Sequence, residues 1–430
     1  MEKMIYNKFD VLKTLAILLL VCVPSKTFSL FFLALFIAYK LAMNKTLSRA
    51  KIIFIFIFFI NALFSITYNG FGHLANYFLF VIFISPLVLM LFFEPQPSII
   101  TNESRVAKKN KLKKAIEYFL IVQILFSVAA ILYRGLSSGF KLDVNFGDAV
   151  AGTFRWPFSY SIDSANVVFA FTMILVLLFY RFQFKKEINK LIFISSCVIV
   201  FISSVNHLFI CIVIAVVIAS VRPSKILVNL IVLLFLLYLF SIISPTNFKI
   251  ITERIGLIFS FGNGADSLSD NLKIQYIATF FDDLILEPIK FILTGTGCGN
   301  YSSRAALFFT GEYVNNFNFV KMSLYTENNT YPLLIELKNR PHFLQGSFHY
   351  PYNSIITFFA ELGIIPAMYF LYSWIKKIFN STGFKFSENL ILISFILLAS
   401  IVDNYLEYYQ AMFVIYFLIK KKREFNCYET

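Results

Sequence analysis

The chain has 430 residues, of which 58% are hydrophobic and only 14% are charged, and its mean hydropathy is +0.74. A soluble domain carries about 25% charged residues, so this composition excludes a soluble globular protein. The formal net charge is +14, but no folded basic domain exists to carry it, and a nucleic-acid-binding function is therefore not expected.

The apolar residues form long runs that are typical of transmembrane helices. Each span needs about 20 apolar residues, and backbone groups in lipid must bond within the segment, which favours helices over strands. We therefore predict an all-α polytopic membrane protein with about 12 transmembrane helices. The predicted spans are 11–24, 28–43, 51–67, 74–93, 115–133, 164–180, 191–205, 207–221, 226–244, 353–375, 388–402 and 407–420. The first resembles a secretory signal, but further spans follow at once, so we expect a retained helix.

One long polar stretch separates the ninth predicted span from the tenth. It divides the chain into three parts. These are an N-terminal membrane domain with spans 1–9 (1–244), a loop subdomain (245–352), and a C-terminal membrane domain with spans 10–12 and a tail (353–430).

Lysine and arginine residues set the predicted orientation, because they are enriched in cytoplasmic loops. If the N-terminus is inside and the spans alternate, 26 of the 38 basic residues fall on the inner side, and 8 of the other 12 lie in the long loop. We therefore predict that both termini, including the tail, are cytoplasmic and that the long loop is a large periplasmic subdomain.

Within the long loop, residues 271–287 show helical spacing of apolar residues, and Pro288 is expected to end that helix. A glycine-rich turn follows at 295–299. Its GTGCG sequence lacks the strand and helix of a dinucleotide fingerprint, so a tight turn with positive φ angles is the better interpretation. Residues 300–345 are rich in aromatic side chains, for which core packing is the default interpretation and sugar stacking the alternative.

Polar side chains near the outer ends of spans are candidates for function. Arg155 and Arg254 each lie within about ten residues of a predicted span, and arginine holds diphosphates and carboxylates with a planar fork. Glu361 falls about eight residues inside the tenth span, where a carboxylate is costly and usually functional. The alternatives are solvated loop charges for the arginines, and a glutamate that faces a water-filled cavity or a capping neighbour.

Metal and disulfide sites are not expected. No pair of the five scattered cysteines has the spacing of metal ligands. The four histidines fall on or near the predicted outer side, as in a zinc site, but only His342 and His349, seven residues apart, are close in sequence, so scattered structural histidines are the better interpretation.

Two stretches carry a resemblance to a known family. The sequence SFHYPYNSIITFFAELGIIPAMYF, residues 347–370, resembles the superfamily of bacterial O-antigen polymerases and ligases, whose Asn, Glu and Gly intervals match Asn353, Glu361 and Gly363. The preceding FILTGTGCGNY looks like the family's glycine-rich turn. Residues 151–171 are similar to a second family stretch, in which Arg155 and Asn166 match an arginine followed by an asparagine that opens a span.

The chain departs from the family pattern at two positions. Tyr352 occupies the place of the family's histidine, with His349 three residues earlier, and Lys273 replaces a loop arginine. The missing histidine argues against a ligase, so the resemblance is to the O-antigen polymerase family in particular.

The resemblance implies a glycosyltransferase of lipopolysaccharide biosynthesis in the cell inner membrane. It would join undecaprenyl-diphosphate-linked oligosaccharide repeat units into surface polysaccharide on the periplasmic side. The alternatives are an O-antigen ligase that transfers polysaccharide to lipid A-core, or a flippase for the repeat unit. No cofactor is implied, and the implied partners are membrane lipids and a chain-length regulator protein.

The resemblance and the residues together give a set of candidate site residues. The predicted catalytic residues are His349 and Glu361, and the predicted substrate-binding residues are Arg155, Asn166, Arg254, Lys273, Tyr352 and Asn353. If the tenth span begins near Pro351, Glu361 lies roughly 15 Å along it, which makes His349 the better candidate for a base.

Overall fold

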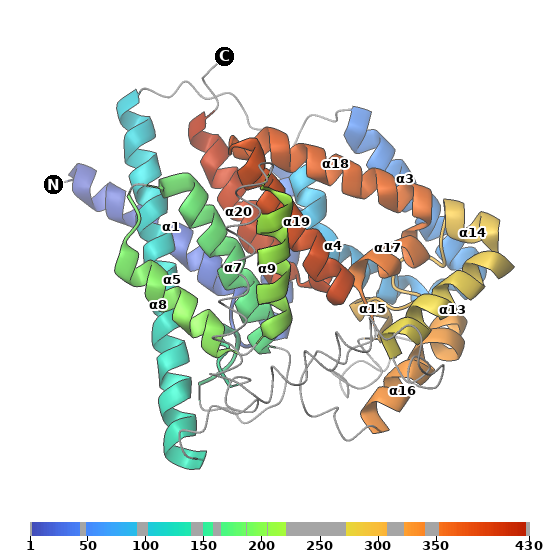
Figure 1. Ribbon diagram of the computed structural model, residues 1–430. Helices are drawn as coiled ribbons and strands as arrows, with labels where there is room; N and C mark the ends of the chain where they lie inside the picture. The colour runs from blue at the N-terminus through green and yellow to red at the C-terminus, as the bar shows by residue number, and fades with distance from the viewer. Residues whose placement is uncertain are drawn as a thin grey trace.

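The computed structural model describes residues 2–43, 49–92, 102–138, 149–157, 165–185, 187–203, 205–220, 272–307, 322–339 and 352–426. Every regular element in these ranges is helical (Figure 1). The N-terminal part contains α1 (Glu2–Val21), α2 (Lys26–Met43), α3 (Arg49–Asn69), η1 (Phe71–His73), α4 (Leu74–Phe92), α5 (Asn102–Ser138), η2 (Gly152–Phe154), α7 (Ala165–Phe184), α8 (Lys190–Ile202) and α9 (Asn206–Ile218).

The remaining helices belong to the predicted loop subdomain and to the C-terminal region. The first group is α13 (Leu272–Leu286), α14 (Pro288–Leu293), α15 (Arg304–Leu307), the π-helix η4 (Thr326–Thr330) and α16 (Tyr331–Asn339). The second group is α17 (Ser354–Leu362), α18 (Ile364–Thr382), α19 (Phe386–Val402), η7 (Tyr405–Glu407) and α20 (Tyr409–Asn426).

Four segments within the described helices are long and apolar enough to cross a membrane. They are Ile52–Asn69, Leu74–Phe92, Val106–Leu136 and Ala165–Phe184. Shorter apolar helices are Phe28–Tyr39, Lys190–Ile202, His207–Ile218 and Phe386–Val402. The chain is therefore an all-α protein with membrane-spanning helices. The full set of 12 spans stays a prediction, and its ninth member, 226–244, lies outside the described residues.

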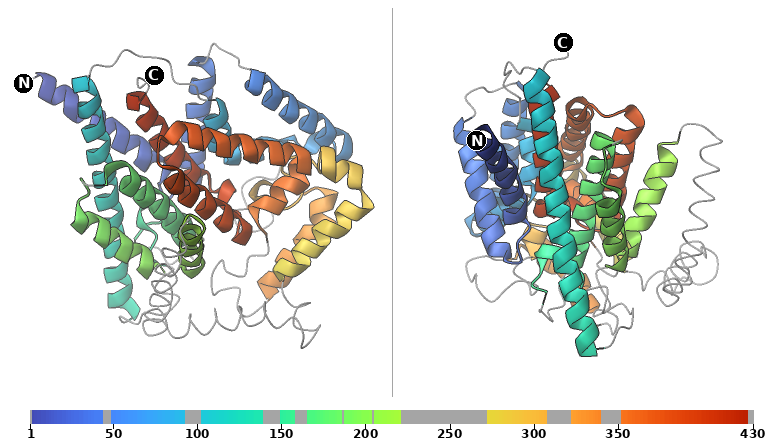
Figure 2. Two further views of the ribbon diagram at one scale, coloured as in Figure 1. Left: turned by 45° about the horizontal axis from the view of Figure 1, so that its top comes forward. Right: turned by 90° about the vertical axis from the view of Figure 1, so that its left-hand side faces the viewer.

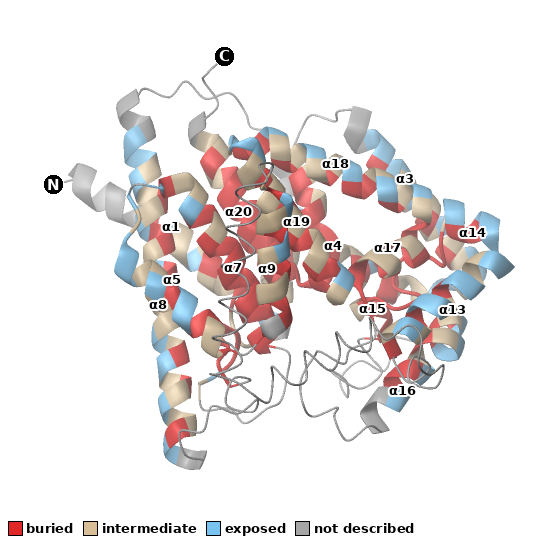
Figure 3. Ribbon diagram, viewed as in Figure 1, coloured by how far each residue is buried: buried red, intermediate tan, exposed pale blue. Residues whose placement is uncertain are grey.

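The helices pack as a bundle around α4, α7 and α20, whose residues are mostly buried at its centre (Figure 3). The N-terminal end of α1 and the C-terminal end of α20 lie toward the same end of the bundle, and α5 runs along one side of it (Figure 2). Many apolar side chains on α2 and α3 remain exposed, such as Phe31 at 62% and Phe56 at 62%. This outward apolar surface is what a helix facing lipid requires.

The tenth predicted span differs from the prediction of one helix over 353–375. Gly363 has a φ of 90° and separates α17 from α18. A Cβ on Gly363 would lie 2.7 Å from the carbonyl carbon of Leu293. The break therefore serves a close approach between this helix pair and α14, which the local sequence did not reveal.

A second, smaller core lies where α13, α14, α16 and α17 meet. Its buried members are mainly aromatic and aliphatic: Leu272, Tyr276, Phe280, Phe291, Tyr301, Leu307, Leu333, Leu334, Tyr352 and Ala360. The described aromatic residues of the loop thus pack in a core, as the default interpretation predicted. The helix predicted at 271–287 is confirmed as α13, and Pro288 ends it but also begins α14.

Candidate functional site

The glycine-rich turn at 295–299 lies against three helices. Gly295, Gly297 and Gly299 have φ angles of 65°, 92° and 77°, so the predicted positive-φ turn is confirmed. Added Cβ atoms would clash with the backbone of α17 at Gly295, with Ser65 of α3 at Gly297 and with the backbone of α4 at Gly299, at distances of 2.5 to 2.6 Å. The glycines therefore permit close packing as well as the turn itself.

Asparagine side chains from the N-terminal spans hold this turn in place. The amide group of Asn61 donates to the carbonyl oxygens of Thr294 and Glu361 at 2.8 and 2.9 Å, and its oxygen accepts the N–H of Cys298 at 3.0 Å. Two more amides donate to carbonyls of the turn, those of Asn69 and Asn76. The loop subdomain is thus fixed to α3 and α4 by hydrogen bonds that would otherwise leave polar groups unsatisfied in an apolar bundle.

Glu361 is fully buried, and its carboxylate is surrounded by backbone N–H groups. Oε2 accepts from Gly299 at 2.5 Å, and Oε1 accepts from Tyr301, Ser302 and Ser303 at 3.1, 3.1 and 2.9 Å. Converging backbone amides form an anion-binding concavity, and here the anion is a side chain of the same protein. Glu361 was a predicted catalytic residue, but this environment favours a role in positioning residues 299–303.

Arg304 directly follows residues 299–303 and begins α15. It belongs to a charged cluster, which we define as Lys273, Arg304, Asp403 and Glu407. The backbone N–H of Arg304 donates to Glu407 Oε2 at 2.5 Å, and its guanidinium carbon lies 4.1 Å from the ring centre of Tyr408. Because the ring lies against the guanidinium, a cation–π contact helps to fix the arginine. The positioned turn therefore places a cation beside two carboxylates.

Asp403 follows α19 directly and is fully enclosed. Its carboxylate accepts from the Asn404 N–H at 2.6 Å and from the Tyr408 hydroxyl at 3.1 Å. Burial raises the pKa of Asp403, and the nearby charges of Arg304 and Lys273 oppose that rise. Lys273 itself donates to the Val402 carbonyl. Burial lowers the pKa of this lysine, and Asp403 counteracts the effect.

Glu407 is a fully buried carboxylate with spare hydrogen-bonding capacity. Oε2 is held by Arg304, but Oε1 has no hydrogen-bond partner among the residues that the structure describes. A buried carboxylate oxygen that has no hydrogen-bond partner in the described part of the chain is placed to accept a proton from a hydroxyl group.

Further contacts link η7, beside the cluster, to α7 and α9, and link α7 to the end of α8. His207 of α9 and the Tyr405 hydroxyl lie 2.5 Å apart, and the ring of Tyr405 lies 4.4 Å from that of Phe171 on α7. The predicted site residue Asn166 donates to the Ser203 carbonyl at 3.4 Å, which joins the start of α7 to the end of α8. These contacts fix the start of α7 and the end of α8 relative to each other, and η7 relative to α7 and α9.

Arg155 follows η2 directly and is buried, with 5% of its surface exposed. The preceding segment is held to α5, since Gln123 bonds both the N–H and the hydroxyl of Thr153. A buried arginine must be neutralised or bonded, so Arg155 is not a simple solvated loop charge.

The other predicted site residues have varied placements. Tyr352 is fully buried in the second core, where its hydroxyl donates to the Thr330 carbonyl and its ring meets that of Tyr276 edge-on. Asn353 caps α17, and its side-chain oxygen accepts the N–H of Ile356 at 2.9 Å. The described contacts of Tyr352 are those of a core residue, and the described contacts of Asn353 are those of a helix cap. Two predicted residues, His349 and Arg254, lie outside the described residues.

The predicted set omitted Arg304, Asp403 and Glu407, although all three are charged residues at the outer side of the predicted topology. The signal for the carboxylates was the polar interruption DNYLE between two apolar runs. Asn61 and Asn76 gave a comparable signal, as amides inside apolar segments. Of the predicted residues with described positions, the structure brings Lys273 into the cluster and places Glu361 next to it.

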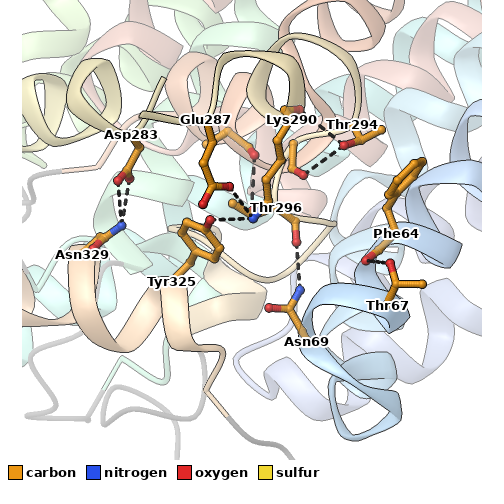
Figure 4. A network of polar contacts seen from close by, with 12 residues as sticks. Phe64, Thr67, Asn69, Asp283, Glu287, Lys290, Thr294, Thr296, Tyr325 and Asn329 are labelled. Atoms are coloured by element: carbon orange, nitrogen blue, oxygen red, sulfur yellow. Dashed lines mark hydrogen bonds and ion pairs between the residues drawn. The ribbon is translucent and has the colours of Figure 1, made fainter. Parts of the chain in front are cut away.

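A second polar network lies within the loop subdomain (Figure 4). Lys290 Nζ lies 3.0 Å from Glu287 Oε2 and donates to the Tyr325 hydroxyl at 2.6 Å. Asp283 accepts from Asn329 at 2.9 Å and from the Tyr301 hydroxyl at 2.7 Å. This network joins α13, α14 and η4, so it serves the packing of the subdomain.

In the described part of the chain, no group of three or more His, Cys, Asp or Glu side chains is placed to hold a metal ion. The chain matches no protein-family model, no curated protein and no solved structure. The geometry and chemistry of the charged cluster are therefore the basis on which a function is proposed.

Proposed function

We propose that the protein is a polysaccharide polymerase of the O-antigen polymerase type. It would join lipid-diphosphate-linked oligosaccharide repeat units on the periplasmic side of the inner membrane. The observation that supports this proposal is the charged cluster, in which Lys273 and Arg304 stand beside the buried carboxylates Asp403 and Glu407. Cations suit a diphosphate leaving group, and a carboxylate with a free oxygen suits a hydroxyl nucleophile.

The proposed reaction is a glycosyl transfer between two lipid-linked chains. A hydroxyl oxygen of the acceptor sugar forms a bond to the anomeric carbon of the donor sugar. The bond from that carbon to the diphosphate oxygen breaks, and the lipid diphosphate leaves with the electron pair. The acceptor proton passes to a protein base, so the step needs no nucleotide and no redox partner.

The residues divide into three proposed roles. Arg304 and Lys273 stabilise the charge that develops on the diphosphate, together with Arg155 and Arg254 at the outer ends of spans. Glu407 accepts the acceptor proton, with His349 as the alternative base. Glu361 positions the 299–303 turn and thereby Arg304, so its contribution to catalysis is indirect.

Deletion of the gene tests the proposed function through the length distribution of lipopolysaccharide. If the protein is a polymerase, the deletion strain should show lipopolysaccharide with a single repeat unit on lipid A-core. Expression of the wild-type chain should then restore the full ladder. Free core with accumulated lipid-linked polymer would instead indicate a ligase. Free core with repeat units retained on the cytoplasmic side would indicate a flippase.

Reporter fusions test the proposed orientation, in which both termini are cytoplasmic. Alkaline phosphatase is active only in the periplasm, so a fusion after Asn300 should be active and a fusion after Lys422 inactive. The reverse pattern would contradict the orientation and would place the charged cluster on the wrong side for this reaction.

A further inference from the structure

The helix pair α13–α14 belongs to the loop subdomain, yet much of its exposed surface is apolar (Figure 3). On α13, exposed apolar side chains recur at helical spacing and form one stripe, which consists of Ile274, Ile277, Phe281 and Ile285. On α14, Ile289 and Leu293 are 75% and 51% exposed. Water is an unfavourable environment for such a surface, so the helix pair requires an apolar neighbour.

The rest of the α13 surface is divided between a buried side and a narrow polar strip. The buried side packs in the second core through Leu272, Tyr276 and Phe280. The polar strip lies between the buried side and the apolar stripe, and its members follow at intervals of four and three residues: Gln275, Thr279 and Asp282. A helix with this pattern is suited to lie in the membrane interface, with its apolar stripe in lipid and its polar strip toward water.

The position of α14 along α3 gives its depth, because residues Ile52–Asn69 of α3 form a segment that can cross the membrane. Lys290, the third residue of α14, has its Nζ atom 4.4 Å from the ring centre of Tyr68, at the end of this segment. Thr294, directly after α14, accepts a hydrogen bond at 2.8 Å from Asn61, about halfway along the segment. Asn61 lies roughly 12 Å before the segment's end at 1.5 Å per residue, so α14 descends from the end of α3 toward its middle.

The glycine-rich turn then returns the chain to the end of α3. The carbonyl of Thr296 accepts a hydrogen bond from the Asn69 amide at 3.0 Å. The backbone N–H groups of Gly295, Thr296 and Gly297 are buried and donate to carbonyls of α14 and α17 at 2.7, 2.8 and 3.2 Å. Non-helical backbone is tolerated at membrane depth only where protein buries it and satisfies its polar groups, and the turn meets this condition.

The exposed apolar surface of α14 continues onto neighbouring helices. Leu293 lies against Gly363 at the start of α18, where Ile365 and Met368 are 56% and 57% exposed. On α3, Phe59 is 58% exposed, and this helix faces lipid. Acyl chains that cover α3 and α18 would therefore also cover α14, which lies between them and is fixed to both.

From these positions, we infer that residues 272–297 form a re-entrant hairpin in the half of the bilayer that holds the C-terminal end of α3. The partner of its exposed surface is the acyl chains of the surrounding lipid. α13 lies in the interface, α14 enters the hydrocarbon, and the glycine-rich turn brings the chain back. Glu287 and Lys290 stay at the level of Tyr68, where water reaches the helix ends. The inference places part of the predicted periplasmic subdomain inside the membrane, and it does not depend on the proposed glycosyl transfer.

Nitroxide spin labels on the full-length protein in liposomes test this placement. The labelled variants are Phe281→Cys, Ile289→Cys and Leu293→Cys, each in a background that carries Cys197→Ser and Cys427→Ser. Oxygen concentrates among acyl chains and a neutral nickel chelate stays in water, so the ratio of their collision rates with the label reports its surroundings. Because α14 descends, we expect the ratio to be higher at Leu293→Cys than at Ile289→Cys.

Two matched controls set the scale of this measurement. Asn328→Cys carries the label on an exposed polar position of η4 in the same subdomain, and Phe56→Cys carries it on the exposed apolar side of α3. The ratio at the three hairpin positions should exceed that of Asn328→Cys severalfold and approach that of Phe56→Cys.

A ratio at the hairpin positions equal to that of Asn328→Cys would overturn the inference, because the surface would then face water. Low collision rates with both reagents would also overturn it and would indicate cover by protein, either a second copy or another partner. A measurement on the wild-type chain avoids any effect of the substitutions on folding. A phosphatidylcholine with a photoreactive diazirine on its acyl chain should label peptides from residues 272–293, and the absence of label there would contradict the inference.

Discussion

Glu361 and Glu407 are both fully buried glutamates on either side of the 299–304 segment, but their partners differ in kind. Glu361 accepts four backbone N–H groups, which occupy both of its oxygens. Glu407 accepts one N–H, that of Arg304, and its other oxygen has no partner in the described part of the chain. A buried carboxylate whose oxygens are all bonded by backbone supports architecture, whereas one with a vacant oxygen beside a cation is available for chemistry.

The largest effect in this comparison is expected from Glu361→Ala. The change leaves four buried N–H groups without an acceptor, so we expect a loss of roughly 3 to 5 kcal/mol of stability. The stability of Glu361→Gln should lie between those of Glu361→Ala and the wild type, since its amide keeps only one acceptor oxygen. Thermal unfolding in detergent and protein levels in the membrane measure this.

The control for that experiment is Glu327→Ala, an exposed glutamate in η4. It should unfold at the wild-type temperature. Wild-type stability in Glu361→Ala would show that the backbone contacts do not support the fold.

Arg304→Ala should abolish polymer formation while the protein remains folded. Loss of one preorganised cation or donor at a developing negative charge typically costs about 10² or more in rate. Arg304→Lys should restore activity only in part, because lysine lacks the planar fork. Polymer length on gels, normalised to the protein in the membrane, measures both variants.

A full polymer ladder in Arg304→Ala would remove this residue from the chemistry. Arg181→Ala is the matched control, since Arg181 is an exposed arginine at the end of α7 and should tolerate the change.

A smaller loss of polymer is expected at Arg155, which tests the same proposed binding of the diphosphate by arginine. It is buried near the start of α7, and Arg155→Ala should strongly reduce polymer while Arg155→Lys retains part of it. The readout is again polymer length per folded protein. Arg254→Ala should behave in the same way, and normal polymer in both alanine variants would exclude these arginines from diphosphate binding.

The smallest effect is expected at Glu287, a half-exposed member of the second polar network. The Tyr325 hydroxyl, and after it Lys290, hold the pKa of Glu287 below its usual range. A lowered pKa stabilises the fold above the unfolded-state pKa of about 4.3, and that contribution is lost as the pH falls through the folded-state pKa.

Because the Glu287 side chain is 48% exposed, Glu287→Gln should cost only about 0.5 kcal/mol at pH 7. Unfolding at pH 7 and at pH 3 measures the difference, which should disappear at the lower pH. The exposed Glu327→Gln serves as control, and a difference that grows on acidification would have the wrong sign for this account.

Local patterns in the sequence predicted the helical class, α13 and the positive-φ turn, because each depends on neighbouring residues. They did not predict the break at Gly363, whose reason is the backbone of Leu293, 70 residues away. The same patterns placed Glu361 deep within a predicted span but gave it no partners. Its four N–H partners come from a turn about 60 residues earlier, and only the tertiary fold brings them together.

Local sequence patterns also could not predict the charged cluster, because its members are far apart in the sequence. Arg304 and Glu407 are 103 residues apart, and each by itself resembles an ordinary loop charge. Lys273 was identified through a family resemblance, and the fold then places it beside Asp403. Asn61 and Asn76 were visible as amides in apolar runs, but nothing in the sequence indicated that they hold the loop.

The most direct test of the division between the two glutamates is Glu407→Gln in a strain that lacks the chromosomal gene. The amide oxygen can still accept the Arg304 N–H, so the fold is expected to survive, but the side chain can no longer take up a proton. We predict wild-type protein levels and unfolding temperature together with lipopolysaccharide that carries a single repeat unit. His349→Ala, measured beside it, should retain more polymer. A full ladder from Glu407→Gln at equal protein levels would contradict the account, because the vacant carboxylate oxygen would then have no part in the reaction.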